Sequence, residues 1–136
     1  MARALYRTAA VLMLLYALGH SASYPWSDPA WQVDLGALQT KPFNVLGFSR
    51  TYWDFYVGHG LFVSVLLLLA AIVAWQLGGL PAGTLSHMRA TAWALPLCFA
   101  ALTALSWCYF FTIPIAFTSA ITVCLVAAAW RSTGSA

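Results

Sequence analysis

Two of the three histidines are the residues of this chain with the most chemistry to offer. His20 ends one apolar stretch, and His59 lies two helical turns into the next one. If both stretches cross a membrane, these two histidines lie at similar depth on different helices and can meet, whereas His87 falls at the opposite side. Ionisable groups inside such spans are costly and are often retained for function. His20 and His59 are therefore the first candidates for a binding or catalytic site.

Two charged residues stand close to His59 in the sequence. Arg50 and Asp54 are four residues apart, which is the spacing of an ion pair on successive turns of one helix. Asp54 lies about 140° around a helix from His59, so we do not expect it to orient the imidazole. Tyrosines share helical faces with both histidines. The candidate ligand-binding residues are His59, His20, Tyr56, Tyr52, Tyr16, Asp54 and Arg50.

Metal and nucleophile chemistry have little support in the sequence. A metal site needs three or four ligands. His20 and His59 with an aspartate of the external loop would supply three, but no HxxxH or HExxH spacing supports this set, so we assign no metal ligands. Two facing histidines can hold haem b, which keeps open a haem- or metal-dependent membrane redox enzyme that uses His20 and His59. The serines lack a nucleophile elbow. Cys98, Cys108 and Cys124 form no CxxC motif, and we interpret them as small buried apolar fillers.

Long apolar stretches must position these residues. The chain of 136 residues is 62% hydrophobic and only 7% charged, whereas soluble domains carry roughly a quarter charged residues. A helix that crosses a membrane needs about 20 mostly apolar residues. We predict an all-α integral membrane protein, a single-domain up-down bundle of four helices that cover residues 4–20, 52–77, 86–109 and 112–130.

The charges predict how these helices are oriented. With four spans, one side of the membrane carries Arg3, Arg7, Arg89 and Arg131, and the other side carries all three aspartates. The positive-inside rule makes the arginine side cytoplasmic. Both termini are then cytoplasmic, and residues 21–51 form an external loop. Nucleic-acid binding would need a basic stripe, so we expect no nucleic-acid partner.

The first 23 residues also fit a secretory signal peptide. They combine two arginines, a short apolar core and a small-x-small site at Ser21-Ala22-Ser23. Cleavage there would leave three spans and an external N-terminus. This alternative stays open beside the model of four helices.

The external loop is too apolar to be a plain connector. Asp28 as N-cap and Pro29 at the first helical position predict a short interfacial helix through AWQVDLGALQ. Ser49 or Thr51 can cap the helix that follows. We expect the loop to form a lid on the bundle, packed back through the side chains of Phe43, Val45, Leu46 and Phe48.

Three features together resemble small, uncharacterised four-helix inner-membrane proteins of bacteria. They are the histidine that closes the first span (ALGHS), the long aromatic outer loop, and the aromatic, glycine-containing start of the second span (YWDFYVGHG). The resemblance covers most of the chain. It implies a four-helix fold and a location in the inner membrane of a bacterium, and it implies no reaction.

The first functional hypothesis is a binding protein. A lipid-like or quinone-like molecule would occupy an apolar pocket at the external ends of the helices. There a histidine can donate to a quinone carbonyl. The alternatives are an accessory or structural membrane subunit without a ligand, packed against a second copy or another membrane protein, and the redox enzyme described above.

Overall fold

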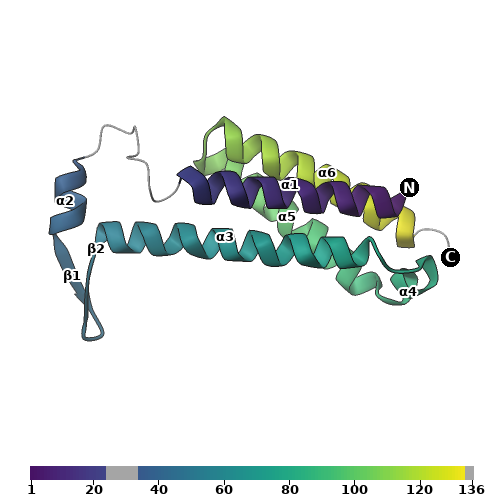
Figure 1. The fold of residues 1–136 in the computed structure, drawn as a ribbon, viewed down its shortest axis with the longest axis horizontal. Helices are drawn as coiled ribbons and strands as arrows, with labels where there is room; N and C mark the ends of the chain where they lie inside the picture. The colour runs from purple at the N-terminus through teal and green to yellow at the C-terminus, as the bar shows by residue number, and fades with distance from the viewer. Residues whose placement is uncertain (24–33, 134–136) are drawn as a thin grey trace. The chain divides into compact units, whose positions relative to one another are not determined.

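The computed structural model describes residues 1–23 and 34–133 of the chain. Within these residues the chain is mostly helical (84%), with six helices and one two-stranded antiparallel sheet (Figure 1). The chain forms two compact units. The first joins Met1–Tyr16 to Leu67–Ala136, and the second is Ala17–Leu66. Helix α1 (Ala2–Ser23) and helix α3 (Tyr52–Leu77) each contribute residues to both units.

Three helices of the described residues are long and apolar enough to cross a membrane: α3, α5 (Arg89–Tyr109) and α6 (Thr112–Thr133). They correspond to the predicted stretches 52–77, 86–109 and 112–130. Helix α5 begins three residues later than the predicted start at residue 86, because a separate short helix, α4 (Ala82–His87), precedes it. Helix α1 spans 22 residues but does not belong to this group, since arginines and a histidine interrupt its apolar sequence. The predicted span over residues 4–20 stays a prediction.

In the first unit, α1 presents a continuous buried stripe. Tyr6, Ala9, Ala10 and Met13 follow one another at helical spacing, and none is more than 4% exposed. Three of the four are small or flexible, which suits close packing between helices. One turn further on, the ring of Tyr16 stacks on Phe117 of α6 at 5.1 Å between centroids. The part of α1 from Met1 to Tyr16 is therefore packed against other helices of this unit (Figure 1).

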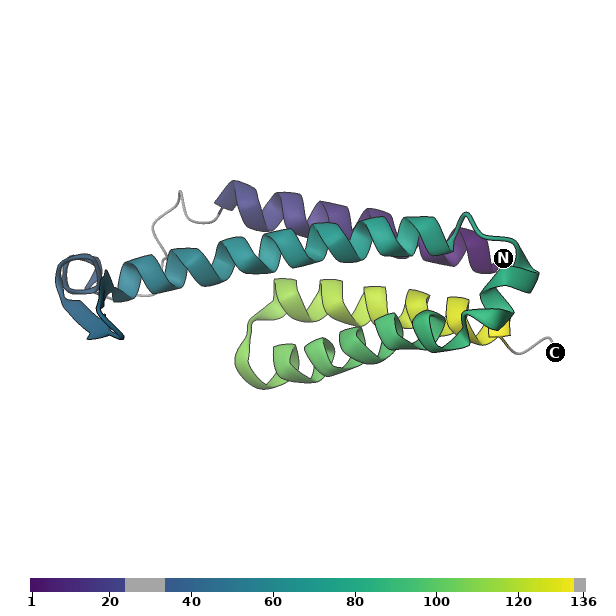
Figure 2. The same ribbon diagram turned by 90° about the horizontal axis from the view of Figure 1, so that it is seen from below.

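Helices α5 and α6 form an antiparallel pair joined by a tight turn at Phe110 and Phe111 (Figure 2). Two hydrogen bonds between side chains connect α5 and α6 at different positions along their axes. The hydroxyls of Thr103 and Thr122 lie 2.9 Å apart, and the indole N–H of Trp93 donates to the hydroxyl of Thr133 at 3.2 Å. Such contacts between helices are worth little individually, but at two levels they fix the rotation of α6 relative to α5.

The arginines that the sequence assigned to one side of the membrane lie at one end of the first unit. Arg131 at the end of α6 donates to the sulfur of Met1 at 2.9 Å. The guanidinium of Arg7 lies over the ring of Trp75, 4.5 Å from its centroid, and Arg89 begins α5 at the same end. Met1, the end of α6, the short helix α4 and these side chains thus share one end of the unit (Figure 1).

The second unit contains a hairpin that we did not predict. Helix α2 (Leu35–Thr40) is capped by Asp34, whose carboxylate accepts from the amide of Ala37. Strands β1 (Pro42–Val45) and β2 (Phe48–Thr51) follow and pair antiparallel. Leu46 and Gly47 form the turn between them with positive φ values of 50° and 85°, as in type I′ hairpin turns.

The predicted lid is only partly confirmed. The predicted helix start at Asp28 and Pro29 lies outside the described residues, whereas the following GALQ segment is helical as expected. Packing through the apolar loop side chains is wrong for three of the four. Val45, Leu46 and Phe48 are 53%, 94% and 65% exposed, because they line the outer part of a hairpin instead of folding back. Phe43 does pack, against aromatic rings of α3.

Candidate functional site

His20 joins α1 to α3 through a hydrogen bond. Its Nδ1 lies 3.0 Å from the hydroxyl of Ser64. That hydroxyl also donates to the carbonyl of Gly60, one turn earlier on α3, at 3.2 Å. When Ser64 donates to this carbonyl, the imidazole must supply its Nδ1 proton to the hydroxyl oxygen. His20 thus acts as a polar contact between two helices, in a place where the sequence suggested a ligand-binding group.

We expect this contact to be measurable as a coupling free energy. In a double-mutant cycle with His20→Ala and Ser64→Ala, the coupling should be about 0.6 kcal/mol and at most about 1.7 kcal/mol, the range for hydrogen bonds between membrane helices. Unfolding of the purified protein in mixed micelles provides the free energies. His59→Ala combined with Ser64→Ala is the matched control and should show no coupling. A His20–Ser64 coupling indistinguishable from this control would contradict the assignment.

His59 faces a different side of α3. Its position is five residues before Ser64, which is about 140° around the helix. The side chain is exposed, and its ring lies 4.9 Å from the ring of Phe55 between centroids. The two histidines therefore do not present facing imidazoles to a common ligand. This arrangement gives the two-histidine haem hypothesis no geometric support.

The three candidate tyrosines each pack on another aromatic ring. Tyr16 stacks on Phe117 in the first unit. In the second unit, Tyr52 lies 5.1 Å from Phe43 and Tyr56 lies 5.5 Å from Trp53, both between centroids. Aromatic pairs of this kind stabilise by about 0.5–1.5 kcal/mol beyond burial. These contacts give each of the three tyrosines a structural role in packing.

Asp54 and Arg50 build the junction between the hairpin and α3. The carboxylate of Asp54 accepts from the amide of Thr51 at 2.8 Å, and the Thr51 hydroxyl accepts from the amide of Asp54 at 3.1 Å. This reciprocal pair is a capping box, and it confirms Thr51 as the cap. The predicted placement of Arg50 and Asp54 on one helix is wrong, because Arg50 lies on β2, although the charge of Arg50 still acts electrostatically on Asp54. Its guanidinium donates to the carbonyl of Ser49 at 2.7 Å.

Metal-ligating groups do not gather in the part of the chain that the structure describes. No cluster of three or more histidine, cysteine, aspartate or glutamate side chains occurs there. Cys98 and Cys108 are exposed on α5, so their interpretation as buried fillers is wrong, whereas Cys124 is half-buried. The sequence offered no spacing that would have placed these thiols on the outer side of α5.

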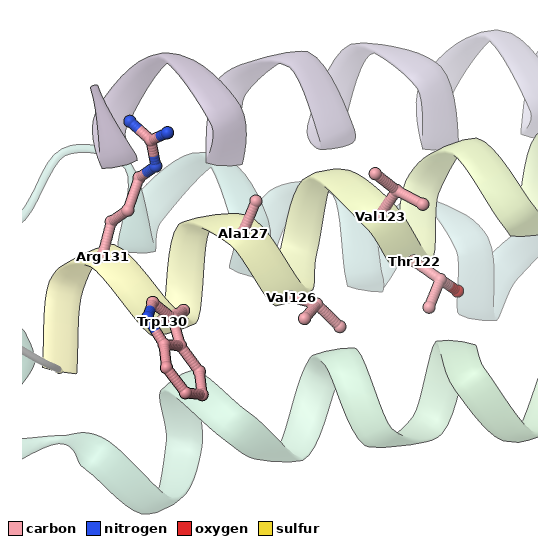
Figure 3. Close-up of a pocket in the computed structure, with 6 residues that line it drawn as sticks. All are labelled: Thr122, Val123, Val126, Ala127, Trp130 and Arg131. Atoms are coloured by element: carbon pink, nitrogen blue, oxygen red, sulfur yellow. The ribbon is translucent and has the colours of Figure 1, made fainter.

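A groove along α6 is the feature that the sequence did not predict. Its volume is about 440 Å³, and one strip of α6 lines it. Thr122, Val126 and Trp130 point to one side of this strip, and Val123, Ala127 and Arg131 point to the other (Figure 3). Each row repeats every four residues, which places its members on one helical face. The walls are apolar up to the last turn of α6, where Trp130 and Arg131 supply an aromatic ring and a positive charge.

No protein-family model matches this chain, and no curated protein or solved structure is significantly similar to it. The function must therefore follow from its own residues.

Proposed function

We propose that this chain is an integral membrane protein, with both termini cytoplasmic, that holds a phospholipid in the groove along α6. The membrane location is supported by helix length. Helix α3 with 26 residues, α5 with 21 and α6 with 22 are about 39, 32 and 33 Å long at 1.5 Å per residue, and the hydrocarbon core is about 30 Å thick. The shared end of Arg3, Arg7, Arg89 and Arg131 supports the orientation, because positive charge favours the cytoplasmic side.

The composition of the groove is the single observation that supports a phospholipid as the ligand. Val123, Val126 and Ala127 offer only methyl groups, and Thr122 adds a methyl group beside its hydroxyl, which already contacts Thr103. The volume of about 440 Å³ falls within the range of about 300–1,000 Å³ that is typical of sites for small molecules. An acyl chain fits such a surface, since it brings no polar group that needs a partner.

The cytoplasmic end of the groove favours a phosphate headgroup over a quinone. Trp130 is 70% exposed there, and tryptophan prefers the depth of lipid headgroups. Arg131 is always charged, and a guanidinium recognises phosphate with paired donors. Its contact with the sulfur of Met1 is weak, so a phosphate can replace it. A quinone would need a donor at its carbonyl but gains nothing from a full positive charge.

We expect native mass spectrometry from a mild detergent to show the protein with one retained phospholipid. Val126→Trp should abolish this adduct because the indole fills the groove, whereas Val65→Trp should leave it intact. Val65 is the matched control, since it is an equally apolar residue, 64% exposed, on α3 and outside the groove. Loss of the adduct in both variants, or its retention in both, would refute the proposed site. A wild-type protein that carries no phospholipid would refute the function.

A further inference from the structure

The hairpin has one apolar and one polar face. Residues directly opposite each other in an antiparallel pair point to the same side, and side chains alternate along each strand. The register pairs Val45 with Phe48 and Phe43 with Arg50, which places these four side chains on one face. The other face carries Pro42, Asn44, Ser49 and Thr51. We call the first set the apolar face, although it includes Arg50.

The apolar face continues onto α3. Phe43 packs on Tyr52 at 5.1 Å and on Phe55 at 6.3 Å between ring centroids. Phe55 in turn contacts His59, and Tyr52, Phe55 and His59 are all exposed. A band of exposed aromatic rings thus runs from the hairpin down one side of the first turns of α3. The hairpin extends across the direction of α3 rather than along it (Figures 1 and 2).

Positive charge borders this face, and the nearest carboxylate in this part of the chain, that of Asp54, is held by the amide of Thr51 at the start of α3. Lys41 and Arg50 are the charged residues between Lys41 and Thr51, and both are exposed. The guanidinium of Arg50 lies 5.8 Å from the ring centroid of Phe48, so the charge sits directly beside the apolar side chains. Apolar and aromatic side chains mixed with lysine or arginine are the composition of segments that lie in the interface of a membrane.

We infer that the apolar face of the hairpin lies on the outer headgroup layer of the membrane, with Phe43, Val45 and Phe48 in the acyl boundary and Arg50 and Lys41 on lipid phosphates. This inference rests on the proposed membrane location and is independent of the groove on α6. If α3 crosses the membrane, a hairpin extending across its direction runs along the surface. Exposure of Val45 and Phe48 then has a physical reason, because lipid solvates them.

Spin-label accessibility tests the inference in full-length protein. Cys98, Cys108 and Cys124 are replaced by alanine, and single nitroxide labels are attached at Val45→Cys and Phe48→Cys on the apolar face. Asn44→Cys and Ser49→Cys are the matched controls on the polar face. In vesicles of phosphatidylethanolamine and phosphatidylglycerol, the ratio of oxygen to nickel-chelate collision rates should be several-fold higher at the first pair than at the second.

A further label at Leu66→Cys separates failure of the inference from failure of the proposed location. Leu66 is 60% exposed near the middle of α3 and should show deep lipid contact. Lipid contact at Leu66 together with equal, water-like values on both hairpin faces would overturn the hairpin inference alone. Labels on the apolar face that are immobile and shielded from both reagents would mean that a protein partner or a second copy covers it. Water contact at Leu66 would overturn the membrane location and the hairpin inference with it.

Discussion

Truncation of Tyr6 to alanine should destabilise the protein by about 3–5 kcal/mol, the range for removing a large aromatic side chain from a packed interior. Tyr6 is fully buried and is the largest side chain in that state among the described residues. It lies on the buried stripe of α1, where Gly78 at the end of α3 approaches its Cβ. Removal of the ring leaves a cavity that these helices cannot close, because the backbone of α1 is already in contact with Gly78.

Tyr6→Phe separates the contribution of the Tyr6 ring from that of its hydroxyl. The Tyr6 hydroxyl is buried beside Ser132 but makes no hydrogen bond of good geometry with it. An unsatisfied buried hydroxyl costs free energy, so its removal should leave the free energy of unfolding within about 1 kcal/mol of wild type. Unfolding of both variants in mixed micelles, followed by circular dichroism, gives the comparison. Equal destabilisation by phenylalanine and alanine would show that the hydroxyl, rather than the ring, holds this region together.

Replacement of Gly78 by valine should cost about 1–3 kcal/mol through overpacking. A Cβ at this position would lie 3.1 Å from the Cβ of Tyr6, 3.2 Å from the carbonyl oxygen of Arg3 and 3.3 Å from the Cγ of Arg7. Two of these three atoms belong to the α1 backbone or its first side-chain carbon, and such atoms cannot rotate away. The branched side chain of valine would therefore push α1 and α3 apart.

Gly58→Ala is the control for this prediction because Gly58 lies inside α3, the helix that Gly78 directly follows. A Cβ there would meet nothing within 4 Å. Alanine raises helix propensity by roughly 1 kcal/mol over glycine, so this variant should be neutral or more stable than wild type. The two glycine substitutions are thus expected to change the midpoint of unfolding in opposite directions. A midpoint for Gly78→Val at or above that of wild type would contradict the close approach.

The elements that could be predicted are those whose signals are local. Helix α3 begins and ends at the predicted residues, since a continuous apolar run defines its length and the Thr51–Asp54 capping box defines its start. The hairpin was missed for an equally local reason. Its turn places Leu46 at a φ of 50°, where asparagine, aspartate or glycine is usual, so the sequence lacked the ordinary turn signal.

The candidate site depended on information that a sequence pattern does not contain. The spacing placed His20 and His59 at similar depth, but whether they face each other depends on the rotation of α1 about its axis. That rotation depends on contacts between residues far apart in the chain, such as the hydrogen bond between His20 and Ser64. The groove on α6 could not be predicted from the sequence for a similar reason. Its lining residues form a groove only where neighbouring helices leave that strip of α6 uncovered.

Helix α1 has a consequence for how the protein is made. It is synthesised before α3, α5 and α6, and it is less suited by its own apolarity to remain in a bilayer than these three helices. It nevertheless carries a continuous stripe of residues that other helices must cover. If the chain is inserted as it emerges from the ribosome, α1 gains its stabilising contacts only after α3 and α6 have followed. Helix α1 would then wait in the bilayer for the helices that stabilise it, and a chain that stops before α6 would leave its buried stripe without these contacts.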